Sequence, residues 1–170
     1  MPSTKRTFKI LFVIYFVLLF VFVVVKFNGS FDTLTSRIEI IERSRAAGYW
    51  NINLTPFDTL DRYIGIQSNG FAFFNLWGNI IPFLPLGFLL PGAFFKPPTF
   101  LKTIGSCLLT ILCIETFQFF TLLGYFDIDD IILNFLGCLI GYLFFAAYRG
   151  LARQAQKHRT GVTDEQGWKL

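Results

Sequence analysis

Residues 100–123 read FLKTIGSCLLTILCIETFQFFTLL, an apolar run long enough to cross a bilayer as a helix. Glu115 interrupts this run, and Gln118 follows one helical turn later. An ionised carboxylate at such a depth costs about 2.5–3.5 kcal/mol on insertion scales. A residue of this kind normally faces the protein interior or a water-filled cavity, where it has a polar partner. We therefore expect Glu115 to mark a buried polar site.

Three other stretches are similarly long and apolar, at residues 8–27, 71–95 and 128–148. Hydrophobic residues make up 54% of the chain and charged residues 15%, against about 25% charged in soluble domains. None of the runs alternates apolar and polar residues as a membrane barrel strand does, so we expect helices. The sequence predicts an all-α, polytopic membrane protein whose four transmembrane helices form one domain, residues 8–148, followed by a basic tail at 149–170.

Most positive charges outside the loop at residues 28–70 gather at the two ends of the chain and around one short turn. They include Lys5, Arg6 and Lys9 before the first span, Lys96 and Lys102 between the second and third, and Arg149, Arg153, Lys157 and Arg159 after the last. By the positive-inside rule we expect a multi-pass protein of the cell membrane with both termini in the cytoplasm. Since the charges flank the spans, the net charge of +4 gives no reason to expect nucleic-acid binding.

The long connection at residues 28–70 is expected on the outer, extracellular side of the membrane. Apolar residues recur at helical spacing within 31–47, which predicts an amphipathic helix on the membrane surface. An irregular segment broken by Pro56 follows, and a second short amphipathic piece is expected at 59–66. Trp50 suits the level of the lipid headgroups.

Polar residues of the last three spans belong to the outer half of the predicted membrane. On each span they lie three or four residues apart, so each set occupies one helical face. We expect the three spans to surround an outward-opening polar pocket. The candidate binding residues are Asn79, Glu115, Gln118, Asp127, Asp130 and Asn134. We expect Asp129 to be a solvated charge at the rim.

Other small and polar residues are interpreted as packing groups. Asn75 is read as a hydrogen-bonding contact between helices, and the pair Gly137 and Gly141 lets another helix approach the fourth span closely. The cysteines all fall inside spans, at Cys107, Cys113 and Cys138, without the spacing of a disulfide framework or a zinc site. The sequence therefore predicts no bound metal and no cofactor.

Three blocks of the chain together resemble the VanZ-like family of small membrane proteins. Residues 51–57 (NINLTPF) are similar to its Asn-Leu-x-Pro-Phe element, and residues 75–87 (NLWGNIIPFLPLG) to its Asn…Phe-x-Pro-Leu-Gly element. The most distinctive block joins Glu-x-x-Gln at residues 115–118 to Asp-x-x-Asp-x-x-x-Asn-x-x-Gly at 127–137. Members commonly have an Arg where this chain has Gly124 or Tyr125. The resemblance implies a bacterial cell-envelope protein, in a family whose founding member is tied to teicoplanin resistance.

Two functions remain open from the residues and the resemblance. The leading hypothesis is an envelope protein whose pocket binds membrane lipids by their headgroups, a lipid-linked cell-wall precursor or a lipophilic glycopeptide. The alternative is a membrane-embedded enzyme acting on a phosphorylated lipid. In it Glu115 and Asp130 serve as acid or base, or Asp127 with Asp130 holds a divalent cation. A transporter ranks last because the chain shows neither an inner pathway nor internal repeats.

Overall fold

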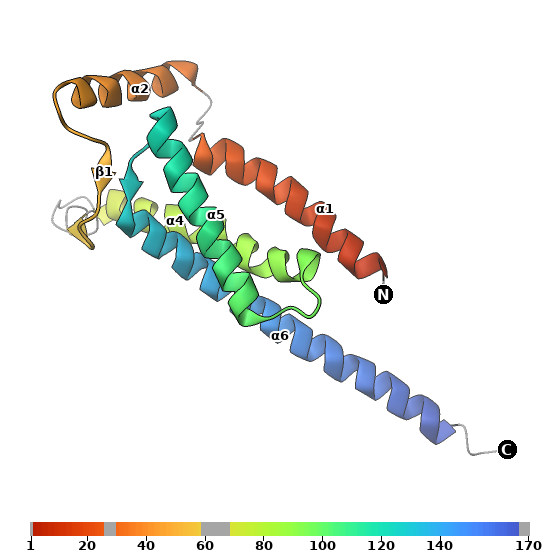
Figure 1. Cartoon of the computed structure of the whole chain (residues 1–170). Helices are drawn as coiled ribbons and strands as arrows, with labels where there is room; N and C mark the ends of the chain where they lie inside the picture. Colours follow the sequence, from red (N-terminus) through yellow and green to blue (C-terminus); the bar gives the residue numbers. More distant parts are fainter. Residues whose placement is uncertain (1, 26–29, 59–68, 167–170) are drawn as a thin grey trace.

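The computed structural model describes residues 2–25, 30–58 and 69–166, without the side chains of 2–4, 69–75 and 157–166. This part of the chain is almost entirely helical (Figure 1). Four of its helices are long and apolar enough to cross a membrane: Lys5–Val24, Leu76–Phe94, Phe100–Thr121 and Ile128–Gln156. The prediction of an all-α protein with four transmembrane helices is confirmed.

The first and last helices differ from their predicted spans. Helix α1 (Pro2–Leu19) continues into a π-helical turn, η1 (Phe20–Val24), so the first span starts before residue 8. Helix α6 (Ile128–Gln166) runs well past the span end expected at residue 148. The helix continues because residues 151–156 (LARQAQ) are all good helix formers.

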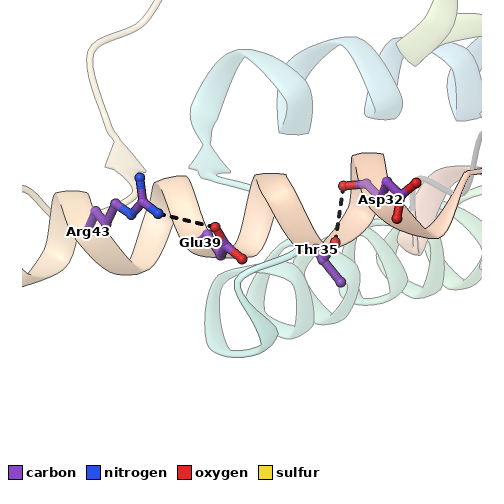
Figure 2. Close-up of polar contacts among 4 residues, drawn as sticks. All are labelled: Asp32, Thr35, Glu39 and Arg43. Atoms are coloured by element: carbon purple, nitrogen blue, oxygen red, sulfur yellow. Dashed lines mark hydrogen bonds and ion pairs between the residues drawn. The ribbon is translucent and has the colours of Figure 1, made fainter.

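Helix α2 (Phe31–Ala46) lies across the end of the bundle that is remote from the N-terminus (Figure 1). The hydroxyl of Ser30 caps it by accepting a hydrogen bond from the Thr33 N–H at 3.3 Å. Its exposed polar stripe includes an ion pair of 3.3 Å between Arg43 and Glu39 (Figure 2), while Ile41 is buried. The structure thus has a helix where one was expected at 31–47, and its place on the membrane surface stays a prediction. The second amphipathic piece, at 59–66, lies outside the described residues.

The tightest seam of the bundle joins α4 (Asn69–Phe94) to α6. A Cβ atom placed on Gly137 would overlap the carbonyl oxygen of Ile80, and one on Gly141 would overlap that of Leu84. The two glycines therefore let the two helix backbones touch. This confirms the prediction of a close approach and identifies α4 as the partner helix.

Helix α1 packs mainly on α4 and leaves much of its surface exposed. The Tyr15 hydroxyl donates to the carbonyl oxygen of Pro82 at 2.9 Å, which gives a buried O–H the partner it needs in lipid. The rings of Phe12 and Phe94 meet edge to face with centroids 4.9 Å apart. The opposite side of the helix, with Val13 among its exposed residues, is apolar and suited to lipid contact.

The core of the bundle lies between α4, α6 and α5 (Phe100–Thr121). Phe83, Ile111 and the thiols of Cys107 and Cys138 are buried there. Both thiols are free, as expected of packing residues. Cys113, by contrast, is exposed.

A two-residue parallel ladder ties residues 47–58, named the outer loop after the side on which they are expected, to the start of α6. Strand β1 (Ile52–Asn53) pairs with β2 (Phe126–Asp127), with Ile52 opposite Phe126 and Asn53 opposite Asp127. The Phe126 N–H also donates to the carbonyl oxygen of Asn51 at 3.0 Å. The loop that follows α2 is thereby held over the end of the bundle where the predicted site lies.

Candidate functional site

Asp127 caps helix α6 and holds the outer loop. One carboxylate oxygen, Oδ1, accepts a hydrogen bond from the Asp129 N–H at 2.9 Å, the contact expected of a capping residue. The other, Oδ2, accepts from the Asn53 amide at 3.3 Å. Both oxygens thus engage the protein itself, so this candidate binding residue has a structural task.

Asp129 is not the solvated rim charge that we expected. It is fully buried, and its Oδ1 accepts a hydrogen bond of 2.6 Å from the backbone N–H of Phe57. The outer loop folds back over the first turn of α6 at this point, and Phe57 adopts a left-handed backbone with φ of 67°. The expectation was wrong because the covering segment is 72 residues away in the sequence.

A second buried contact fastens the loop to the end of α5. Asn51 donates to the carbonyl oxygen of Gly124 at 2.6 Å and accepts from the Arg45 Nε at 2.7 Å. Arg45 also donates to the Phe119 carbonyl at 2.7 Å, and its guanidinium lies 4.6 Å from the centre of the Phe119 ring. Sequence reasoning did not select this pair. The sequence feature that could have pointed to it is the position of Arg45, four residues after Ile41 on the apolar stripe of α2.

Deeper in the bundle, two side-chain pairs join three helices. Asn79 of α4 donates to Asp130 of α6 at 2.5 Å. One turn further along α6, the Asn134 amide donates to the Glu115 Oε1 of α5 at 3.5 Å. Glu115 and Asn134 are each 2% exposed. The structure thus brings four of the six candidates together, and the binding of a ligand by this polar cluster stays a prediction.

Gln118 is buried near the polar cluster but points to a different element. Its Nε2 donates to the carbonyl oxygens of Val23 and Val24 at 2.8 and 3.1 Å. Carbonyls at a helix end lack partners within the helix, so this amide satisfies the end of η1. Gln118 therefore holds the first span against the third. The side chain of Asn75 lies outside the described part of the structure.

Asn134 has unused hydrogen-bonding capacity in the interior. Its Oδ1 is buried and has no hydrogen-bond partner among the described residues. Buried polar atoms normally have partners in the protein or in ordered water, so this acceptor has capacity for a further hydrogen bond. The described residues hold no group of three or more His, Cys, Asp or Glu side chains that could bind a metal. Asp127 and Asp130, considered above for a cation, each accept a hydrogen bond from an asparagine.

Comparison with known proteins gives a family match. A family model described as VanZ/LLP1 matches residues 12–149, which is most of the chain and includes the whole polar cluster. No curated protein matches the chain. No solved structure matches it either.

Proposed function

The chain belongs to the VanZ/LLP1 family, and from this premise and its polar cluster we propose that it binds the polar headgroup of a lipid-linked molecule. The cluster is formed by Asn79, Glu115, Asp130 and Asn134 at the end of the bundle that carries the outer loop. The proposed ligand is a lipid-linked cell-wall precursor, a lipid headgroup or a lipophilic glycopeptide. These ligands share an apolar tail with a head that carries hydroxyl or amide donors.

The proposal rests on the hydrogen bonding of the Asn134 Oδ1 atom. It is an acceptor with no hydrogen-bond partner among the described residues, in a side chain that is 2% exposed. Its own amide meets Glu115 at 3.5 Å, a long bond that a better donor can replace. A ligand with two neighbouring donors would satisfy the Asn134 Oδ1 and could add a hydrogen bond to the Glu115 carboxylate. A few precisely placed polar groups of this kind are what orients a ligand in an otherwise apolar site.

The surroundings of the polar cluster suit a ligand that has an apolar tail. At the same end of the bundle, α5 exposes Phe117 and Phe120, which are 41% and 71% exposed and offer a surface for an acyl or isoprenoid chain. Tyr49 and Trp50 of the outer loop are also exposed, at 74% and 64%, and suit the headgroup layer. The tail would remain in lipid while the head reaches the polar cluster.

Resistance to teicoplanin-type glycopeptides is the cellular consequence that we propose. A protein that holds a cell-wall precursor, or the lipophilic glycopeptide itself, changes how much of the antibiotic reaches its target. Glu115→Gln should then abolish resistance in cells that express the chain, at an unchanged protein level. Resistance that persists with this variant would count against this consequence.

The direct test is native mass spectrometry of the full chain extracted in mild detergent. The wild type should retain a lipid-linked species, and Asn134→Leu and Glu115→Gln should each reduce its occupancy by about fivefold or more, since each removes hydrogen bonds to the ligand. Thr110→Val is the matched control. It also removes a polar group from α5, but the Thr110 hydroxyl bonds to the Ser106 carbonyl of its own helix at 2.8 Å.

Two outcomes would refute the headgroup site. One is an equal lipid complement in all four proteins, and the other is a loss in Thr110→Val as large as in the two cluster variants. Glu115→Gln keeps the shape of the side chain, so it reports on binding even if Asn134→Leu folds poorly. Size-exclusion profiles of the four proteins separate the two effects.

A further inference from the structure

A cavity of about 360 Å³ lies at the opposite end of the bundle from the polar cluster. Its walls come from the first turns of α1, from the end of α4 with the turn that follows, and from the middle of α6. Figure 1 shows these segments away from α2, at the end where the N-terminus lies. None of the residues discussed above as candidate binding groups lines it.

Four cationic side chains line this basic cavity. They come from three separate segments: Lys5, Lys96, Arg149 and Arg153. Among the described residues that line it, none is acidic. Like charges that lie close together repel one another. An anion placed between them attracts each of them, and this attraction offsets the repulsion. The composition of the cavity therefore favours an anionic ligand.

Arg149 is oriented for such a ligand. It is partly buried, and its Nη1 donates to the carbonyl oxygen of Pro98 at 3.0 Å. A guanidinium group has five N–H donors in a fixed plane, so this bond holds the group in place and leaves donors for a phosphate. An arginine held in this way binds phosphate oxygens in pairs, which a freely moving lysine does not.

Aromatic side chains form much of the remaining wall. The Phe8 ring lies 6.1 Å from that of Phe145 and 6.0 Å from that of Tyr148, measured between centroids. The same ring stacks on Phe88 at 5.9 Å. The cavity thus has a cationic part and an apolar part, a combination that suits an amphipathic molecule better than a free ion.

The cavity lies at the level of the membrane surface. The first span begins at Lys5, which lines the cavity, and the second ends at Phe94, next to the lining residue Phe95. Basic residues at this end are expected from the positive-inside rule alone. That rule does not explain why four of them converge, because Lys9 and Lys102 lie at the same end and do not line the cavity.

We propose that the basic cavity binds the phosphate headgroup of an anionic phospholipid of the cytoplasmic leaflet. The cations contact the phosphate, and the aromatic wall contacts the glycerol and the first part of an acyl chain. Basic recesses between transmembrane helices recognise anionic headgroups by this chemistry. The site is separate from the polar cluster and does not depend on its proposed function.

The test is lipid binding to the purified full chain in neutral detergent, measured by native mass spectrometry and by thermal shift. The probes are phosphatidylglycerol, phosphatidylcholine and inorganic phosphate. Lys96→Gln/Arg153→Gln removes two exposed cations of the cavity. Lys9→Gln/Lys102→Gln is the matched control, since it removes the same charge from the same end outside the cavity. We expect the first variant to bind phosphatidylglycerol at least about tenfold more weakly and the control to change by less than about twofold.

The comparison of variants and probes distinguishes lipid binding in the basic cavity from general attraction between an anionic lipid and a basic protein. Equal weakening in both variants would overturn the proposal, because it would mean that overall charge recruits the lipid. Phosphatidylcholine binding as tightly as phosphatidylglycerol, or inorganic phosphate stabilising the protein as well as the lipid does, would also overturn it. Arg149→Lys gives a further check. It keeps the charge but loses paired phosphate contacts, and an affinity equal to that of the wild type contradicts the role given to Arg149.

Discussion

The two ends of the helix bundle handle polar groups in opposite ways. Around the outer loop, the side chains of Asn51, Asp127 and Asp129 are buried, and each is bonded to a segment remote in sequence. At the other end, Lys96 and Arg153 are exposed and line an open basic cavity. The difference teaches that polar groups in one small membrane protein can serve two purposes. The buried groups around the outer loop fix the fold, and the exposed cations at the other end remain available to a ligand.

The largest loss of stability is expected from a substitution in the α4–α6 seam, because these two helices contribute residues to both ends of the bundle. Gly141→Ala forces a methyl group into the carbonyl oxygen of Leu84, which is backbone and cannot turn aside. We expect a loss of about 2–3 kcal/mol in the free energy of unfolding, measured by denaturant titration in detergent. Both ends of the bundle should become less stable together. The difference between them described above would then disappear.

Gly105→Ala is the matched control for this substitution. Gly105 lies in α5, and a Cβ atom there would meet nothing within 4 Å. Replacing a helical glycine by alanine in open space should raise stability by about 0.5–1 kcal/mol. Equal effects of the two changes would mean that the α4–α6 seam is not the tight contact described above.

An intermediate effect is expected at the end with the buried groups. Asp129→Ala leaves the Phe57 N–H without its acceptor, at a cost of about 1–3 kcal/mol, and should release the loop around Phe57. Limited proteolysis would show faster cleavage in this loop. Glu42→Ala changes an exposed acid of α2 on the same side and should alter the free energy of unfolding by less than about 0.5 kcal/mol. Cleavage as slow as in the wild type would show that the loop is held by something else.

The smallest effect is expected at the basic end. Without added lipid, Lys96→Gln/Arg153→Gln should change the free energy of unfolding by less than about 0.5 kcal/mol, because both side chains are exposed. The measurement is the same denaturant titration. If the free energy of unfolding fell as much as in Asp129→Ala, the cations would be structural. The two ends of the bundle would then not differ in the way described above.

The helices and their polar faces could be predicted because both follow from local spacing. Apolar runs of sufficient length gave the four spans. The three- and four-residue steps placed Asp130 and Asn134 on one face of α6, where they meet Asn79 and Glu115. The glycine pair also revealed a close helix contact, although spacing alone could not say which helix makes it.

The contacts that spacing could not predict are those with backbone groups far along the chain. Gln118 shares a helical face with Glu115, yet it bonds to carbonyls at the end of η1, and a π-helical turn has no sequence signature. Arg45 and Asn51 likewise bond to carbonyls in the last turn of α5 and just after it, at Phe119 and Gly124. Which carbonyl oxygens lack a hydrogen-bond partner within their own helix depends on how each helix ends in three dimensions. Hence the sequence identified the polar cluster but not the contacts that enclose it.

The short ladder between β1 and β2 has a consequence for biogenesis. Its partners Asn53 and Asp127 are 74 positions apart, so the first strand leaves the ribosome long before the second exists. Chains are synthesised from the N-terminus, and here the second strand immediately precedes the last span. The rim of the bundle is therefore the final part to assemble. A chain interrupted before Phe126 would contain three of the four spans and would leave the strand at Ile52–Asn53 without its partner strand.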